Sequence, residues 1–196
     1  MSRLGQNTTT SFIEWNDFIS LITRLEKDKE YKFCLLISIG VFTGLRISDL
    51  LTLKCSHILN EDVFLLTEKK TKKDRSIKVN STLKDIVKRV YSKLGVSNLD
   101  EFIFLNKYGT KCIDKSYVNV KLKELFVKYR IRVKGNISTH TFRKTLGRRV
   151  IEVNNYSNES MVLLMELFGH SNMGITKRYL GITKDEIHNV YDCLTF

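Results

Sequence analysis

The stretch TGLRISDLL, residues 43–51, places one arginine and one carboxylate at a break between two predicted helices. Its opening Thr-Gly pair ends a mostly apolar helix predicted over residues 31–42, because glycine readily adopts the conformation that closes a helix. Ser48 is a candidate N-cap for a short helix that follows. Arg46 lies between the two helices, and Asp49 follows three positions later. Alone, this is the pattern of an ordinary surface arginine, so its meaning depends on the rest of the chain.

Around this stretch, hydrophobic periodicity and capping residues predict a mainly helical chain. Ser11 and Glu14 form a candidate capping box at the first helix. The predicted helices cover about residues 11–25, 31–42, 48–52, 81–94, 114–129, 140–153, 159–168, 171–180 and 183–194.

A small antiparallel sheet completes the predicted fold class, which is α+β. Two strands, at residues 63–67 and 75–79, flank a polar hairpin tip at residues 68–74, and residues 102–105 are a candidate short strand. No repeat or Gly/Ser/Pro linker interrupts the pattern, so we expect a single domain over residues 1–196.

The charge of the chain is large and unevenly distributed. The 33 Lys and Arg residues exceed the 21 Asp and Glu residues, which gives a net charge of +12. Residues 66–90 hold nine basic and three acidic side chains (+6), and residues 121–149 hold ten and one (+9). Lysine runs are often solvated helix faces, but two concentrated blocks favour a surface for a polyanion, with nucleic acid ahead of an anionic membrane.

Composition excludes several classes of protein. The longest apolar stretch, residues 33–45, contains polar residues and glycines and is too short for a membrane span, which needs about 20 residues. The first residues lack the pattern of a secretory signal. The four cysteines are scattered without CxxC spacing, so we expect reduced thiols, with no disulfide framework and no zinc site, in a cytoplasmic protein.

Three further patterns carry side chains suited to chemistry, and each is weak by itself. The sequence HTFR places His140 and Arg143 on one helical face, where both can donate to one pair of anionic oxygens. A Phe-Gly-His sequence ends at His170, and Tyr179 follows nine residues later. The hairpin tip at residues 68–74 is rich in lysine.

In this order, the TGLRISDLL, lysine-hairpin, HTFR and GH-x8-Y patterns resemble the catalytic domain of the tyrosine recombinases, also called the phage integrase family. The resemblance covers about residues 12–190. It implies the fold of that domain and an enzyme that cleaves and rejoins DNA strands. In such enzymes a tyrosine hydroxyl attacks a phosphodiester and forms a 3′-phosphotyrosine, and a freed 5′-hydroxyl then attacks the phosphotyrosine of a partner strand.

The resemblance assigns roles to five residues. Tyr179 matches the nucleophile, and Arg46 and Arg143 match the arginines whose planar forks bind the phosphate oxygens. His140 matches the histidine that shares this task and helps to accept the tyrosine proton. His170 matches a later His or Trp, a hydrogen-bonding and packing partner. Arginines and histidines carry the charge stabilisation, so no metal or cofactor is implied.

The resemblance also implies a general acid on the hairpin, since the leaving 5′-oxygen needs a proton. Lys70 is the first candidate, and its neighbouring lysines compete with it because this turn lacks the Gly, and the next strand the Pro, that are common in the family. Asp49 matches an acidic position that orients an active-site arginine. Contacts to DNA phosphates are expected from Lys69, Lys72, Lys73, Arg75, Lys144 and Arg148.

The leading interpretation is a site-specific DNA recombinase of a phage or other mobile element. A catalytically silent DNA-binding paralogue and a type IB topoisomerase-like relaxing enzyme are alternatives, and a housekeeping chromosome-dimer recombinase is an alternative biological role. About 11 residues precede the first helix, so we expect the N-terminal DNA-clamp domain of the family to be absent. Binding to DNA should then be weak and less selective.

The implied partner is double-stranded DNA. The apolar stripe of the helix predicted over residues 183–194 fits either its own core or a neighbouring protomer, as in a tetramer formed on DNA by exchange of this helix. We expect a monomer or weak oligomer when the protein is free. Accessory DNA-bending proteins are further candidate partners, no membrane partner is expected, and a cytoplasmic, nucleoid-associated location follows.

Overall fold

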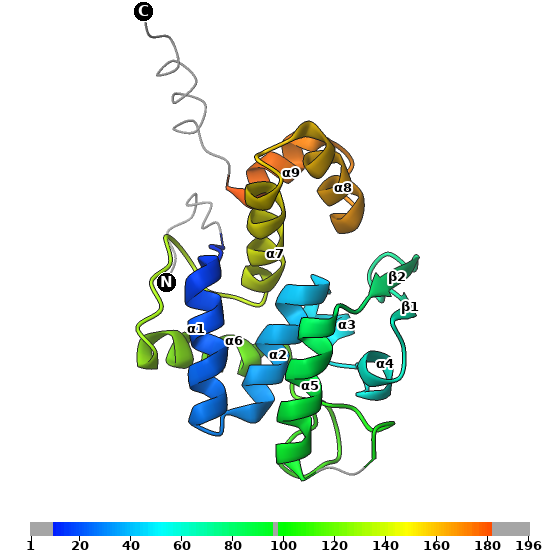
Figure 1. Cartoon of the computed structure of the whole chain (residues 1–196), viewed down its shortest axis with the longest axis vertical. Coiled ribbons are helices and arrows are strands. Elements are labelled where there is room, and N and C mark those ends of the chain that lie inside the picture. The colour runs from blue at the N-terminus through cyan, green and yellow to red at the C-terminus, as the bar shows by residue number, and fades with distance from the viewer. Residues whose placement is uncertain (1–9, 96–97, 182–196) are drawn as a thin grey trace, which may run out of the picture.

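The computed structural model describes residues 10–95 and 98–181, and this part is mainly helical with a two-stranded antiparallel sheet (Figure 1). The predicted fold class is therefore confirmed. The strands are β1 (Val63–Thr67) and β2 (Asp74–Lys78). The helices are α1 (Trp15–Lys27), α2 (Tyr31–Thr43), α3 (Ile47–Leu50), α4 (Ser56–Leu59), α5 (Ser81–Tyr91), the 3₁₀ turn η1 (Ser92–Leu94), α6 (Lys115–Lys128), α7 (His140–Val153), α8 (Asn158–Phe168) and α9 (Met173–Leu180).

Helix α2 lies at the centre of the main core. Every residue from Phe33 to Val41 is buried, and α1, α5 and α7 pack against the helix. A helix that is hydrophobic on all sides is stable only inside the protein, which explains this position. Within the described part of the chain, no helix is long and apolar enough to cross a membrane. Gly44 ends α2 with a φ of 59°, and the next turn carries Arg46.

The β1–β2 hairpin carries the lysine-rich tip at one edge of the molecule (Figure 1). The strands pair from Val63 opposite Lys78 to Thr67 opposite Asp74. Phe64 and Ile77 pair with each other and are buried, which attaches the hairpin to the main core. The tip is thereby held beside the α2–α3 turn.

Helix α7 joins the main core to a smaller C-terminal core. Phe142, near the start of α7, is buried in the main core, whereas Ile151, near its end, belongs to the smaller one. Figure 1 shows α8 and α9 gathered around this second end of α7. The other buried residues of the smaller core are Met161, Leu164, Phe168 and Leu180.

Two predicted N-caps are wrong, because tertiary contacts fix the chain differently. Helix α1 begins at Trp15 after Glu14, with no capping bond from a side chain. The residue before Glu14 is tied elsewhere, since the Ile13 amide donates to Thr145 Oγ1 at 2.9 Å. Helix α3 begins after Arg46, and the Ser48 hydroxyl contacts Asp49 instead of capping the helix.

The strand predicted at residues 102–105 is also wrong. Its two ends make isolated bridges to different partners, Phe102 to Lys54 and Leu105 to Cys112, so no ladder forms. The helix predicted over residues 183–194, with its proposed exchange between protomers, lies outside the described residues.

Candidate active site

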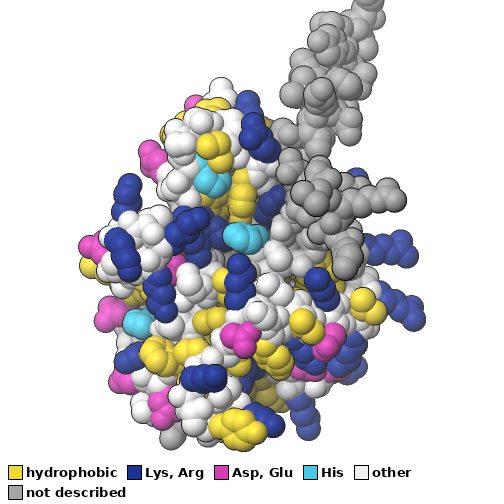
Figure 2. Space-filling model, turned by 180° about the vertical axis from the view of Figure 1, so that it is seen from behind, with side chains coloured by type: hydrophobic (Ala, Val, Ile, Leu, Met, Phe, Trp, Pro, Cys, Tyr) yellow, Lys and Arg dark blue, Asp and Glu magenta, His cyan; other side chains and the backbone are white. Residues whose placement is uncertain are grey.

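The predicted catalytic residues come from four regions that the fold brings together. They are Arg46 in the α2–α3 turn, Lys70 at the hairpin tip, His140 and Arg143 on α7, and His170 and Tyr179 in the α8–α9 segment. Figure 2 views the molecule from behind and shows Lys and Arg side chains gathered around histidine side chains.

His140 is influenced by cations from three elements. Its pKa is lowered from the usual value of 6.5, first by burial of the ring and then by the charges of Lys115, Arg143, Lys144 and Lys70. The influence of Lys70 places the hairpin tip within electrostatic reach of α7. The lowered pKa leaves His140 neutral at pH 7, so one ring nitrogen can accept a proton.

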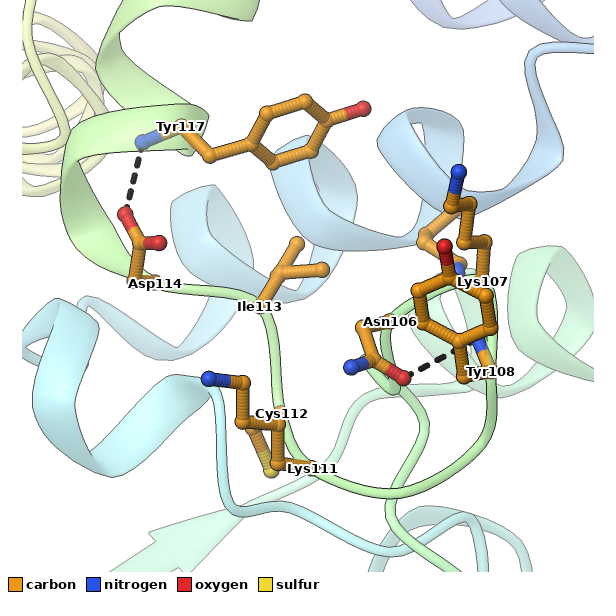
Figure 3. Close-up of a pocket in the computed structure, with 9 residues that line it drawn as sticks. Asn106, Lys107, Tyr108, Lys111, Cys112, Ile113, Asp114 and Tyr117 are labelled. Carbon is orange, nitrogen blue, oxygen red and sulfur yellow. Dashed lines mark hydrogen bonds between the residues drawn. The ribbon is translucent and has the colours of Figure 1, made fainter.

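Two cavities on the surface differ in whether predicted catalytic residues line them. The cavity that contains His140 and Tyr179 has a volume of about 380 Å³ and is also lined by Lys144 and Arg178. A larger cavity, of about 470 Å³, lies at the start of α6 and is lined by Tyr108, Lys111, Ile113, Tyr117 and their neighbours (Figure 3). No predicted catalytic residue lines the larger cavity, whereas His140 and Tyr179 line the smaller one, which therefore forms part of the candidate site.

Tyr179 is held against aromatic rings near the end of α9. Its ring centre lies 5.4 Å from that of Phe168 and 5.1 Å from that of His170. The hydroxyl is buried and makes no geometrically good hydrogen bond to any described residue. Burial raises the pKa of Tyr179, and the nearby guanidinium groups of Arg143 and Arg46 oppose that rise. The hydroxyl is therefore protonated at neutral pH, and it lies next to the cations expected to bind phosphate.

His170 packs against the rings of Phe168 and Tyr179. Its Nδ1 lies 3.0 Å from the hydroxyl of Thr176, one turn before Tyr179. Burial lowers the pKa of His170, with smaller contributions from Arg143 and Arg46. His170 thus links the start of the α8–α9 turn to the helix that carries the tyrosine.

Arg46 and Arg143 converge on one backbone carbonyl, that of Phe168. Arg46 Nη2 donates to it at 3.4 Å, and Arg143 Nη2 donates at 3.3 Å. Arg143 Nη1 also donates to the Gly44 carbonyl at 2.6 Å, and its guanidinium lies 4.7 Å from the centre of the Phe168 ring. Buried backbone carbonyls thus fix both forks side by side, as a shared phosphate requires.

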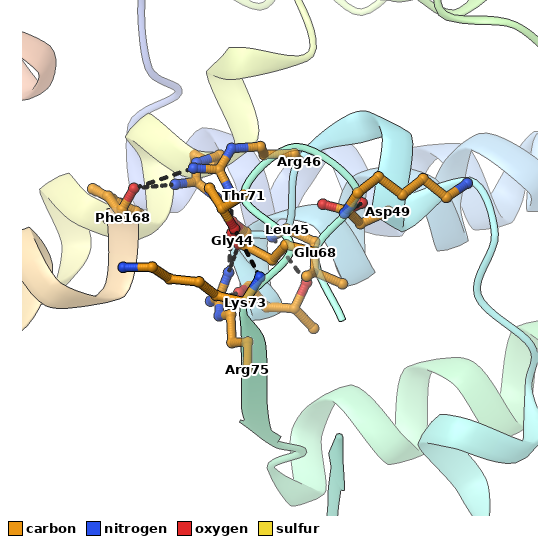
Figure 4. Close-up of polar contacts among 12 residues, drawn as sticks. Gly44, Leu45, Arg46, Asp49, Glu68, Thr71, Lys73, Arg75 and Phe168 are labelled. Atoms are coloured by element: carbon orange, nitrogen blue, oxygen red, sulfur yellow. Dashed lines mark hydrogen bonds and ion pairs between the residues drawn. The ribbon is translucent and has the colours of Figure 1, made fainter. Parts of the chain in front are cut away.

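Arg75 has a different role from the phosphate contact that we expected. Its guanidinium is mostly buried and donates to the carbonyls of Thr43 at 2.6 Å and Gly44 at 3.5 Å (Figure 4). Burial lowers the pKa of Arg75 to about 10. Arg75 therefore stabilises the turn before Arg46, because free carbonyls at the end of α2 need donors.

Asp49 also differs from expectation, since within residues 10–95 and 98–181 none of its hydrogen bonds is to an arginine. The carboxylate is buried, and its Oδ1 accepts the backbone amide of Lys69 at 3.0 Å and the Ser48 hydroxyl at 3.3 Å. Asp49 acts on the hairpin tip, which places it one step from the lysine expected to serve as general acid.

The other expected DNA contacts divide into two groups. Lys69, Lys72 and Lys73 are exposed at the hairpin tip, where they can reach a phosphate. Arg148 instead lies over the rings of Phe12 and Tyr156 and pairs with Glu152. These contacts give Arg148 a structural role, and its contact with DNA stays a prediction.

Lys144 is a buried cation beside the nucleophile. It is only 5% exposed, and its Nζ lies 5.2 Å from the centre of the Tyr179 ring. Burial lowers its pKa. The side chain lines the smaller cavity together with His140 and Tyr179, and its contact with a DNA phosphate stays a prediction.

Sequence reasoning missed Glu68 and Thr71: the Glu68 carboxylate accepts from Arg46 and also from the Thr71 hydroxyl. A single acidic residue at the start of a lysine-rich tip was the available signal, but its partners depend on the fold. Among the described residues, no cluster of three His, Cys, Asp or Glu side chains could hold a metal ion.

Comparisons with known proteins identify the family. Residues 12–186 match the model of the phage integrase family. The chain is 30% identical over 167 residues to "Probable integrase/recombinase YoeC" of Bacillus subtilis, covering 85% of this chain and 86% of that protein. It is also 30% identical over 176 residues to "Tyrosine recombinase" of Thermosipho africanus, covering 89% of this chain and 58% of that protein.

Solved structures share the fold. A XerA recombinase structure matches with a TM-score of 0.70 at 18% identity, covering 95% of this chain and 66% of that one. A Tn1549 transposon integrase in complex with a circular intermediate DNA matches with a TM-score of 0.68 at 23% identity, covering 98% and 68%. A XerH recombinase bound to its difH substrate matches with a TM-score of 0.68 at 18% identity, covering 97% and 55%.

The fold and the site together define the catalytic domain of a tyrosine recombinase. The chain belongs to the phage integrase family. Apart from the Bacillus protein, it spans about half to two thirds of the relatives named above.

Gly147 controls how closely the tyrosine-bearing helix approaches α7. A Cβ at this position would collide with Leu180 Cδ2 and lie 3.2 Å from the Phe168 ring. We expect Gly147→Ala to lower the free energy of unfolding by about 1–3 kcal/mol and to slow DNA cleavage, because α9 must move away. Thermal unfolding and single-turnover cleavage measure the two effects. Wild-type behaviour in both would contradict this packing.

Proposed function

We propose that this chain is a site-specific DNA recombinase that breaks and rejoins strands through Tyr179. The observation that carries the proposal is the convergence of Arg46, Arg143 and the Tyr179 hydroxyl at one position. The two guanidinium groups are fixed on the Phe168 carbonyl, and both oppose the rise in the pKa of Tyr179. A phosphodiester bound to the arginines would therefore lie next to the nucleophile.

The proposed cleavage step uses each of the candidate residues in one role. The Tyr179 oxygen attacks phosphorus and displaces the 5′-oxygen, which leaves a 3′-phosphotyrosine. Neutral His140 accepts the tyrosine proton, and the Lys70 ammonium protonates the departing oxygen. Arg46 and Arg143 stabilise the extra negative charge on the non-bridging oxygens. Attack by a 5′-hydroxyl of another strand reverses the same transfers and completes recombination.

The DNA partner and the biological role rest on charge and relatives. The net charge is +12, and several structural relatives are complexes with DNA. A transposon integrase among those relatives supports a role in a mobile element. We further propose residues 1–196 as a single catalytic domain, a tetramer on DNA, accessory DNA-bending proteins and a cytoplasmic, nucleoid-associated location.

A suicide substrate tests the proposal directly. Nicked duplexes prepared from genomic DNA of the source organism lose a short strand after cleavage and trap the 3′-phosphotyrosine. We expect a covalent DNA–protein adduct that survives denaturation. If the protein binds these duplexes without forming the adduct, it is a silent DNA-binding paralogue. Efficient relaxation of plasmid DNA without strand exchange would instead favour a topoisomerase-like enzyme.

The pH dependence of cleavage tests the role of His140. Because neutral His140 is the acceptor, the wild-type rate should rise with pH and level off above the pKa of His140, which is lowered below 6.5. His140→Gln should reduce the rate by about 10²-fold or more and leave it rising through the neutral range. Rates of adduct formation between pH 5 and 9 distinguish the profiles, and identical profiles would exclude His140 as the acceptor.

A further inference from the structure

Glu68 is a buried carboxylate between catalytic residues that lie far apart in the sequence. It is the first residue of the hairpin tip and is only 7% exposed. Its Oε2 accepts from Arg46 Nη1 and from the Thr71 hydroxyl, the latter at 2.7 Å. Its Oε1 lies 3.7 Å from Arg75 Nη1. Figure 4 shows Arg46, Glu68 and Thr71 directed toward one another.

The ionised form of Glu68 is favoured despite its burial. Burial alone would raise the pKa of this carboxyl group. Hydrogen bonds from Thr71 and Arg46, together with the charges of Arg46 and Arg75, outweigh burial and lower the pKa. A buried carboxylate with such partners is a fixed structural element, because removing one partner would leave an uncompensated charge.

The hairpin tip is closed around Lys70 by bonds on both sides. The Glu68 amide donates to the Lys73 carbonyl, and the Lys72 amide donates to the Glu68 carbonyl, each at 2.9 Å. The Lys69 amide donates to Asp49 Oδ1 at 3.0 Å. The two residues just before Lys70 are thus tied to neighbouring parts of one segment, Glu68 to Arg46 in the α2–α3 turn and Lys69 to Asp49 in α3.

We propose that Glu68 is a positioning residue that couples Arg46 to Lys70. Its carboxylate accepts from Nη1 of the Arg46 fork and the Phe168 carbonyl accepts from Nη2, so the N–H groups that neither uses are left for phosphate. The backbone of Glu68 and the Thr71 side chain hold the turn that presents Lys70. The inference rests on the proposed function. It means that one side chain, Glu68, fixes the positions of both the Arg46 guanidinium, which binds the phosphate, and the Lys70 ammonium, which protonates the leaving oxygen.

An alternative interpretation of the Arg46–Glu68 contact predicts a different effect of removing Glu68. If Glu68 merely occupies Arg46 in place of a phosphate, its removal should free the arginine and strengthen DNA binding or speed cleavage. The coupling proposal requires the reverse, because a loosened tip no longer aims the lysine. The two readings therefore differ in the sign of the change in rate.

A sulfur-substituted substrate isolates the contribution that Glu68 makes to the cleavage rate through Lys70. A 5′-bridging phosphorothiolate leaves as a thiolate, which needs no general acid. We expect Glu68→Gln to slow single-turnover cleavage of the ordinary nicked duplex by about 10²-fold. Most of this loss should be recovered on the sulfur substrate, as for Lys70→Ala. Glu61→Gln, an exposed change outside the hairpin, should behave as wild type on both substrates.

Thr71→Val provides a second variant that leaves the Arg46–Glu68 pair in place. It should show a smaller loss with the same recovery on sulfur, and it keeps the proposal testable if Glu68→Gln unfolds. Equal losses on both substrates, or cleavage at or above the wild-type rate, would overturn the proposal. If the wild type formed no adduct on either substrate, the proposed function itself would be wrong.

Discussion

The substitution Tyr179→Phe is expected to abolish formation of the covalent DNA adduct while leaving the protein folded. The substitution removes only the hydroxyl group, which supplies the oxygen that attacks phosphorus in the proposed step. The hydroxyl is also buried without a good hydrogen bond to any described residue, so its loss should cost little or no folding free energy. Adduct formation falls below detection, whereas thermal unfolding and DNA binding stay near wild type.

Tyr156→Phe is the matched control for this variant. Tyr156 is exposed, and its hydroxyl contacts Arg148 at 3.3 Å, away from the arginine pair that binds Phe168. It should form the adduct at the wild-type rate. An adduct that persists in Tyr179→Phe would show that another tyrosine or another residue is the nucleophile.

Arg143→Gln should produce the second large effect, on both catalysis and stability. Removal of one preorganised donor to the transition state costs about 10²–10³-fold in rate. Within the described part of the chain, the Gly44 carbonyl loses its 2.6 Å bond from Arg143 and keeps only the 3.5 Å contact from Arg75, while the Phe168 carbonyl keeps only its donor from Arg46. A hydrogen bond from a charged group contributes about 1.5–3 kcal/mol, so the free energy of unfolding should fall by an amount of that order. Single-turnover rates measured well below the melting temperature of the variant separate the two losses.

Arg149→Gln is a suitable comparison on the same helix. Its guanidinium lies 5.0 Å from the centre of the Trp15 ring, and it makes no contact with the Phe168 carbonyl. It should retain cleavage within a fewfold of wild type. Comparable cleavage by the two variants would mean that Arg143 has no special contact with the phosphate.

The sequence predicted those parts of the fold that depend on local pattern. The helix predicted over residues 140–153 coincides with α7, His140–Val153. The hairpin strands and the stop at Gly44 were also predictable, since alternation and glycine conformation act over a few residues. The family resemblance then supplied the candidate site residues.

The partners of individual charges could not be predicted from the sequence. Arg75 was an expected DNA contact, yet it satisfies the carbonyls at the end of α2. Asp49 was expected to orient an arginine, yet it holds the hairpin backbone. Whether a charge faces solvent or an orphan carbonyl depends on how segments far apart in the sequence pack together. For the same reason the contacts of Glu68 with Arg46 and Thr71 could not be predicted from the sequence.

The division of the hydrophobic interior at α7 has a consequence for local stability. Tyr179 packs against the smaller C-terminal core, whereas α2 and the turn that carries Arg46 belong to the larger one. Proteins open in cooperative units, and units with fewer buried apolar contacts open at lower free energy. The proposed nucleophile therefore belongs to the less stable unit and Arg46 to the more stable unit, so sub-global opening can separate them without global unfolding.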